Sequence, residues 1–328
     1  MSKKIICLAL SALLFALSVS AQAQQAGKIP RIGYLAASSL SGQSARIEAF
    51  RQGLRELGYV EGKNIVIEYR SAEGKLDRLP ALAAELVRLK VDIIVTGGPI
   101  PTRVAKGATS TIPIVMTQDV DPVGTGLVAS LARPGGNITG LSTLAPELSG
   151  KQLELLKETI PKLSRVAVFG TSTRAGNAQA LEEIELAAKA FGVKLQYLDV
   201  LGPKDIETAF RAASKGRADA VLMMVAGGIA NSQRTQIAEL AVKSRLPAIY
   251  DRSEFVDDGG LMSYGANRSD LARRAATYVD KIMKGRTPAD LPVEQPMKFE
   301  FIINLKAAKQ IGLTIPPNVL VRADKVIR

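Results

Sequence analysis

Ile93–Thr102 reads IIVTGGPIPT, an apolar, β-branched run that leads into two glycines. A second stretch of the same kind, Val221–Ser232, reads VLMMVAGGIANS. Such a run followed by glycines indicates a buried strand that turns directly into a helix. The two Gly-Gly pairs are 130 residues apart, and Pro113 and Pro247, which precede the next apolar runs, are 134 residues apart. The chain therefore contains two copies of one α/β pattern.

Each copy contains four predicted strands. Between them apolar residues recur at helical spacing, as at Ile47, Phe50 and Leu54. Alternating strands and helices predict a parallel sheet with helices on both faces and right-handed crossovers. We therefore expect an α/β protein with two doubly wound parallel-sheet lobes. The predicted strands are Ile32–Leu35, Ile65–Tyr69, Ile93–Val95 and Pro113–Met116, then Val166–Phe169, Lys194–Leu198, Ala220–Val225 and Ala248–Tyr250.

The loops that follow six of these strands favour a ligand site. Ligands of open α/β sheets bind beyond the carboxyl ends of the strands, and two such edges that face each other form a cleft. The loops are rich in Gly, Ser, Thr, Asn and Asp, which offer backbone N–H groups, hydroxyls and carboxylates but also make ordinary turns and caps. The candidate ligand-binding residues are Ser38, Ser39, Gly98, Pro99, Gln118, Asp119, Thr173, Asn177, Gly227 and Asp251.

Some of these candidates have a specific expected role. A carboxylate at a strand end, such as Asp119, can accept a hydrogen bond from a ligand ammonium or hydroxyl group. Ser38 and Ser39 precede the first helix, where a ligand carboxylate is favoured. Three tyrosines close to strands can either flank the ligand or pack in the core: Tyr34, Tyr250 and Tyr264.

The composition argues against most enzyme classes. The chain contains no His, and its one Cys is Cys7. This excludes Ser-His and Cys-His nucleophile pairs and the usual zinc and copper ligand sets. No G-x-x-x-x-G-K-[ST] phosphate loop occurs either. We expect no catalytic residues, no metal and no cofactor, and we predict that the protein is not an enzyme.

The first 23 residues have the pattern of a secretory signal peptide. Lys3 and Lys4 precede an apolar run, Ile5–Ser20, and small residues at Ala21 and Ala23 mark a cleavage site after Ala23. The run falls short of the roughly 20 apolar residues that span a bilayer. We expect a cleaved, periplasmic protein without stable membrane insertion.

The charge of the chain does not indicate a nucleic-acid partner. Lys and Arg number 43 against 31 Asp and Glu, but the basic residues are spread among the predicted helices without a block or a recognition motif. We therefore expect no nucleic acid as partner, and we expect a monomer.

Several motifs resemble those of the TrpX-like group of ABC transporter substrate-binding proteins, which have the type I periplasmic binding protein fold. The similarity extends over nearly the whole chain after residue 23, although Val120 stands where a Ser often precedes the Asp-Pro of the family. The motifs are Gly53-Leu54 with Leu57-Gly58-Tyr59, Asp121–Gly124, Ser130–Gly140, Gly259–Gly265, Ile303–Leu305 and Ile315–Pro317.

This resemblance implies capture of a small polar solute in the cleft by hinge closure, for an importer whose permease and cytoplasmic ATPase are separate chains. Amino acids, aromatic ones included, and small organic acids are the expected ligands. The family fold also implies a multi-strand hinge with three crossings, expected at Gly135–Thr143, Ser263–Asn267 and Leu291–Val293. The implied segments are a signal peptide at 1–23, a first lobe at 28–141 plus 266–292, and a second lobe at 142–265 plus 293–328.

Two other functions are compatible with the same residues. One is an exported α/β enzyme that uses carboxylate or tyrosine chemistry. The other is a ligand receptor that serves a sensor kinase or a chemoreceptor. A LacI-type repressor shares the fold, but it requires an N-terminal helix-turn-helix where this chain has a predicted signal peptide.

Overall fold

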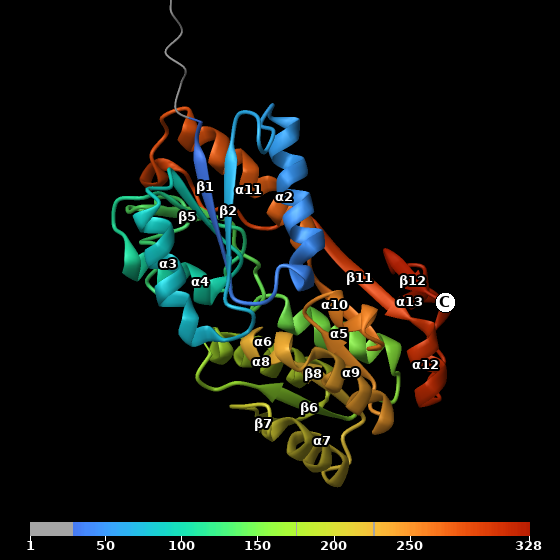
Figure 1. Ribbon diagram of the computed structural model, residues 1–328. Coiled ribbons are helices and arrows are strands. Elements are labelled where there is room, and N and C mark those ends of the chain that lie inside the picture. The colour runs from blue at the N-terminus through green and yellow to red at the C-terminus, as the bar shows by residue number, and fades with distance from the viewer. Residues whose placement is uncertain (1–28, 175, 226) are drawn as a thin grey trace, which may run out of the picture. The chain divides into compact units, whose positions relative to one another are not determined.

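The computed structural model describes residues 29–174, 176–225 and 227–328. Within residues 31–328 the strands form two β-sheets, one of five strands and one of seven (Figure 1). The predicted signal peptide and Cys7 lie outside the described residues. In the described part of the chain, no helix has both the length and the apolar character needed to cross a membrane.

The first sheet is parallel throughout, as predicted. In spatial order its strands are β2 (Val66–Ser71), β1 (Arg31–Ala36), β3 (Ile93–Thr96), β4 (Ile114–Met116) and β5 (Ile138–Gly140). Its helices are α2 (Ser44–Glu56), α3 (Leu79–Arg88), α4 (Pro99–Ala108) and α11 (Arg268–Met283), with 3-10 turns η1 (Ser41–Gln43), η2 (Leu76–Arg78) and η3 (Pro288–Asp290).

Both faces of this sheet are covered by helices because side chains alternate along each strand. Tyr34 of β1 packs in one apolar cluster with α2 and α11, and its neighbour Leu35 packs in another with α3 and α4. Figure 1 shows α2 and α11 next to each other and α3 with α4 apart from them. The lobe is therefore doubly wound.

The second sheet has the same build. In spatial order its strands are β12 (Lys325–Ile327), β11 (Phe299–Asn304), β10 (Met262–Ala266), β9 (Ala248–Tyr250), β8 (Ala220–Met223), β6 (Arg165–Gly170) and β7 (Lys194–Asp199). One face packs against α5 (Ser149–Thr159), α6 (Asn177–Phe191), α12 (Leu305–Ile311) and α13 (Pro317–Leu320), and the other against α7 (Asp205–Lys215), α8 (Gly227–Ser232), α9 (Arg234–Lys243) and α10 (Glu254–Asp257).

One strand pair of the second sheet differs from the all-parallel prediction. β10 and β11 are antiparallel, with Met262 opposite Ile303 and Ala266 opposite Phe299. The chain leaves this sheet at the end of β10 to form α11 and returns at the same edge, where Asn267 donates its backbone N–H to Lys298 O at 3.0 Å. Because the chain re-enters the sheet at the edge where it left, β11 runs antiparallel to β10.

The chain crosses between the sheets three times, and the crossing segments are hydrogen-bonded together. Leu141 bridges to Glu294, and the Ser142 N–H donates to Glu294 O at 2.9 Å. The first crossing starts later than expected because Ile138–Gly140 form β5, paired with β4, within the predicted crossing. The second and third crossings flank α11.

The contact of α2 with α11 depends on the absence of a side chain at Gly53. A Cβ atom at Gly53 would lie 2.3 Å from the Arg273 carbonyl oxygen and 2.9 Å from Ala276 Cβ. A carbon atom cannot lie that close to either neighbour. Any residue larger than glycine at position 53 would therefore push α2 and α11 apart. Gly53 is also part of a motif that carries the family resemblance.

Candidate functional site

A cavity of about 280 Å³ lies between the carboxyl edges of the two sheets. Its walls come from the loops after β1, β3 and β4 of the first sheet and after β6, β8 and β9 of the second. These are the six loops that the sequence analysis identified. The size is that of a small-molecule site, for which hundreds of cubic ångströms are typical.

Eight of the ten candidate residues line this cavity, namely Ser38, Gly98, Pro99, Gln118, Asp119, Thr173, Gly227 and Asp251. The other two, Ser39 and Asn177, are not among the lining residues. Ser39 Oγ accepts the Gly42 backbone N–H at 3.2 Å, so it serves a local turn. Asn177 begins α6, and its Nδ2 donates to the Tyr197 hydroxyl oxygen at 3.2 Å.

The Gly-Gly pair after β3 fits the cavity wall closely. Gly98 has φ +149°, a conformation that side-chain-bearing residues rarely adopt. A Cβ atom at Gly97 would lie 2.8 Å from Gln43 Oε1. The sequence therefore needs both glycines to bring α4 to the cavity.

Sequence reasoning missed the basic part of the site. Arg174 and Arg252 stand in loops that it identified, but neither was chosen, because an arginine in a loop is usually a solvated surface residue. Arg268 begins α11, and its approach to Asp251 depends on the third dimension. The residues of the lining that were missed include Gln43, Arg46, Arg103, Thr143, Thr171, Arg174, Asn231, Arg252 and Arg268.

Asp251 is the centre of an arginine cluster, to which the second lobe contributes Arg174 and Arg252 and the start of α11 contributes Arg268. Arg252 Nε donates to Asp251 Oδ1 at 2.8 Å, and Arg268 Nη2 donates to Asp251 Oδ2 at 3.2 Å. Arg174 Nη1 donates to the backbone oxygen of Met224 at 2.8 Å. The Asp251 carboxylate is thus hydrogen-bonded by two guanidinium groups, and Arg174 acts on it through its charge.

The pKa values of this cluster reflect the crowding of positive charge. Burial on its own raises the pKa of Asp251, but Arg252, Arg268 and Arg174 hold it well below its ordinary value. Burial, together with the charge of Arg252, lowers the pKa of Arg268 to about 10. Both groups therefore remain charged at neutral pH, and the cluster keeps an excess of positive charge.

The opposite wall contains acceptors instead. Gln43 Nε2 donates to Ser38 Oγ at 2.8 Å, and Gln118 Nε2 donates to Gly97 O at 3.2 Å. The Oε1 atoms of both glutamines and Oδ2 of Asp119 are buried and have no hydrogen-bond partner among the described residues. Such atoms need a donor from water or from a ligand.

Asp119 differs from Asp251 in its protonation. Its side chain is 1% exposed, and burial raises its pKa to about 6, while the hydrogen bond from the Asp121 N–H to Oδ1 at 3.1 Å opposes this increase. At neutral pH the carboxylate is mostly ionised, and it is the charge on this wall that can accept an ammonium group.

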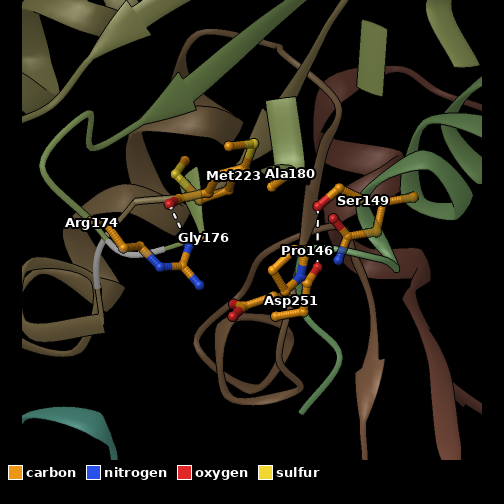
Figure 2. Close-up of a pocket in the computed structure, with 10 residues that line it drawn as sticks. Pro146, Ser149, Arg174, Gly176, Ala180, Met223 and Asp251 are labelled. Carbon is orange, nitrogen blue, oxygen red and sulfur yellow. Dashed lines mark hydrogen bonds between the residues drawn. The ribbon is translucent and has the colours of Figure 1, made fainter. Parts of the chain in front are cut away.

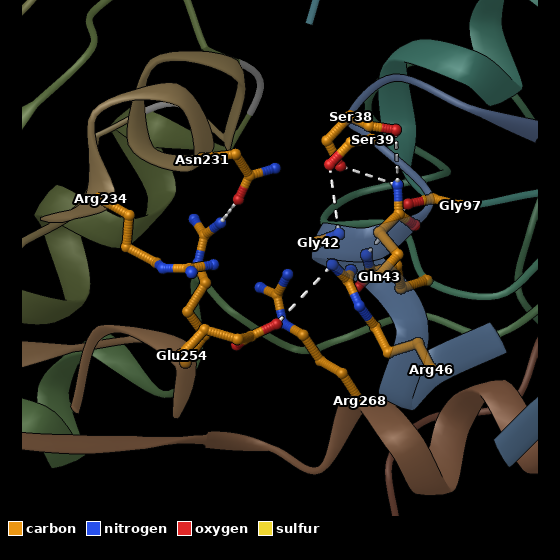
Figure 3. A network of polar contacts seen from close by, with 12 residues as sticks. Ser38, Ser39, Gly42, Gln43, Arg46, Gly97, Asn231, Arg234, Glu254 and Arg268 are labelled. Atoms are coloured by element: carbon orange, nitrogen blue, oxygen red, sulfur yellow. Dashed lines mark hydrogen bonds and ion pairs between the residues drawn. The ribbon is translucent and has the colours of Figure 1, made fainter. Parts of the chain in front are cut away.

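A single ion pair joins α2 of the first lobe to α10 of the second. Arg46 Nη2 lies 3.7 Å from Glu254 Oε1, and Figure 3 shows the two side chains meeting beside Arg268. On the other side of the cavity the lobes come close at Gly228, where an added Cβ would lie 3.7 Å from Leu76 Cδ1. The lobes therefore meet around the cavity.

Two smaller voids adjoin the cavity behind Asp251. The one in Figure 2 lies between Arg174, Asp251, Pro146 and Met223 and holds about 10 Å³. The second has the same volume and includes Gln152, whose Nε2 donates to Tyr264 O at 2.8 Å. Each is the size of one water molecule and is too small for a solute.

The tyrosines considered as ligand contacts belong to the core. Tyr34 is 1% exposed and Tyr250 fully buried, and Tyr264 stacks with Phe299 at a centroid distance of 6.2 Å. None of the described residues that line the cavity is aromatic. Within the described chain, no group of three or more Cys, Asp or Glu side chains is placed to bind a metal ion.

The profile of the family described as ABC transporter substrate binding protein matches residues 35–327, and thus both lobes and the cavity. The chain belongs to the ABC transporter substrate binding protein family. This confirms the predicted family and its role in solute binding for an ABC transporter.

Similar proteins of known structure share the whole architecture of this family member. A conserved domain protein from Vibrio cholerae is 29% identical, with TM-score 0.83, and the match covers 91% of this chain and all of that one. An ABC domain from Streptococcus pneumonia, solved in complex with L-Trp, is 26% identical with TM-score 0.83 and covers 92% and 100% of the two chains. The predicted type I periplasmic binding protein fold is confirmed.

A curated relative carries a name that states its ligand. The tyrosine-binding protein of Clostridioides difficile is 26% identical over 266 residues, which are 81% of this chain and 76% of that protein.

Proposed function

We propose that this substrate-binding protein captures a small solute with a carboxylate group, an amino acid or a small organic acid, in the cavity between its lobes. The observation that supports this most directly is the cluster of Arg174, Arg252 and Arg268 on the wall of the cavity between the sheets. Guanidinium groups bind carboxylates with paired, charge-assisted hydrogen bonds. The tyrosine-binding relative and the L-Trp complex add support for an amino acid.

The ligand contacts that we propose come from both walls of the cavity. The cluster around Asp251 holds the carboxylate, and Asp119 with Gln118 accepts hydrogen bonds from the other polar end of the solute. Ser38, Gly98, Pro99, Thr173 and Gly227 complete the enclosure. Ser39 and Asn177 support the wall from behind.

Binding closes the two lobes by rotation about the crossing segments. The lobes comprise residues 28–141 plus 266–292 and 142–265 plus 293–328. The backbone hydrogen bonds of Glu294 with Ser142 and Gly140 keep the segments together during the motion. The closed protein delivers its solute to a permease whose cytoplasmic ATPase is a separate chain.

We further propose that the protein works in the periplasm as a monomer after cleavage behind Ala23, and that it does not convert its ligand chemically. The charged start, the apolar run and the Ala-Gln-Ala site support export. Membership of a substrate-binding family supports the absence of turnover.

A thermal-shift screen of residues 24–328 tests this function. The panel contains amino acids (tyrosine, tryptophan and acidic ones among them), small organic acids and neutral sugars. We expect carboxylates to raise the melting temperature, with about 2.7 kcal/mol of stabilisation at a concentration 100 times Kd. The radius of gyration in X-ray scattering should fall with the same ligand.

Stabilisation by sugars alone would contradict the proposal. Chemical change of a bound compound during incubation, followed by NMR, would instead show an enzyme.

A further inference from the structure

The described cavity wall carries more positive than negative charges. The described lining residues include five arginines, Arg46, Arg103, Arg174, Arg252 and Arg268, but only two acids, Asp119 and Asp251. Arg46 has Glu254 as an ion-pair partner at 3.7 Å. Asp119 lies on the opposite wall, where the nearest cationic influence is Arg103. The excess of positive charge is therefore concentrated around Asp251.

Glu254 acts electrostatically on Arg252 and Arg268 as well as on Arg46. The four guanidinium groups around Asp251 and Glu254 therefore leave two positive charges uncompensated. Arg252 and Arg268 share this carboxylate, with distances of 2.8 and 3.2 Å. Arg174 has no carboxylate within ion-pair distance among the described residues, and its one hydrogen bond to Met224 goes to a backbone oxygen. Like charges held this close repel each other more strongly in a protein interior than in water. Two negative charges from a ligand would balance them.

Outside the arginine cluster, the described cavity wall offers a solute hydrogen-bond acceptors but no aromatic side chain. No aromatic side chain lines the described cavity, so a ring of the solute has no stacking partner. The unpartnered acceptors of Gln43, Gln118 and Asp119 call for hydrogen-bond donors, which an amino group supplies.

Building on the proposed function, we infer that the solute is a small dicarboxylate, with acidic amino acids as its best-fitting members. Both carboxylates are bound by the arginines around Asp251, and Arg174 is the residue that selects for the second negative charge. A neutral amino acid of the same shape leaves one guanidinium without an anionic partner in the closed cleft.

Calorimetric titration with four solutes tests this specificity. L-glutamate and glutarate carry two carboxylates, L-glutamine has the shape of glutamate without the second charge, and L-tyrosine represents an aromatic amino acid. We expect both dicarboxylates to bind at least about tenfold more tightly than L-glutamine, the range of a charge-assisted hydrogen bond.

Arg174→Gln is the informative variant. Coulomb attraction scales with the charge of the ligand, so we expect its affinity for glutamate to fall by about tenfold or more and that for glutamine by less than about threefold. Arg211→Gln is the matched control, because it removes one positive charge from the exposed face of α7 and should leave both affinities unchanged. Circular dichroism verifies that each variant is folded.

L-glutamine or L-tyrosine bound as tightly as glutamate would overturn the inference and leave the proposed function intact. Equal losses for glutamate and glutamine in Arg174→Gln would remove the assigned role of Arg174. A folded protein that binds none of the carboxylates, here or in the wider panel, would overturn the proposed function as well.

Discussion

Asp119 illustrates how a single buried carboxylate links binding to stability. It is almost fully buried, and its Oδ2 has no hydrogen-bond partner among the described residues. Burial raises its pKa from 3.8 to about 6. Its pKa in the unfolded chain is lower, so folding favours the protonated form. The resulting stabilisation is fully present below pH 3.8 and is lost as the pH rises through about 6.

Replacement of Asp119 should therefore stabilise the empty protein at neutral pH. For Asp119→Asn we expect the free energy of unfolding without ligand to increase by about 2 to 3 kcal/mol at pH 7.5, because the buried charge is removed. At pH 4, where the wild-type carboxyl is mostly protonated, the difference should nearly vanish. Urea denaturation at the two pH values measures this, and an equal effect at both would contradict it.

At the level of elements, α2 and α11 lie in close contact. Gly53 allows it, since an added Cβ would lie 2.3 Å from the Arg273 carbonyl oxygen. For Gly53→Ala we expect a loss of about 1 to 3 kcal/mol in the free energy of unfolding, because the helices must separate. Gly107→Ala in α4 is the control: nothing lies within 4 Å of its added Cβ, and the change should stabilise by up to about 1 kcal/mol. Loss of stability in both variants would argue against a steric cause.

The ion pair between α2 and α10 has a different consequence, because its partners belong to different lobes. Arg46 and Glu254 meet at 3.7 Å only when the lobes are together. We expect Glu254→Gln to raise the open population and to weaken ligand binding by about threefold, which corresponds to the loss of a partly exposed pair. Fluorescence transfer between a dye on each lobe measures this opening.

Glu56→Gln is the matched control for that measurement. It breaks the 2.9 Å pair of Glu56 with Arg273, whose partners both belong to the first lobe. The open population should not change. An identical effect of Glu254→Gln and Glu56→Gln would show that charge alone, and not the link between lobes, is responsible.

For the whole molecule, the sequence predicted the architecture better than the site. All eight predicted strands overlap observed strands within two residues, because apolar runs and glycine stops are local signals. The antiparallel β11 and the arginines could not be found in this way. Which side chains surround Asp251 is decided by a strand end, a loop and α11, which begins 17 residues later in the chain. No local sequence pattern predicts that these three segments come together.

The return of the chain to its first lobe should make a simple N-terminal fragment incomplete. Leu271, Ala275 and Tyr278 of α11 are fully buried against α2 and the first sheet. We expect residues 28–141 alone to lack fixed tertiary structure, and the same segment joined by a flexible linker to residues 266–292 to fold. Dispersion of amide signals in NMR spectra distinguishes the two states, and a well-dispersed spectrum of the short fragment would contradict the expectation.

Because the chain returns to its first lobe after most of the second, the two lobes of a newly made chain complete their packing in a fixed order. The first lobe waits for α11, and the second sheet waits for β11 and β12 at the very end of the chain. Neither half can reach its final packing while synthesis is still short of residue 268. The first lobe therefore completes its packing before the second, once α11 has been made.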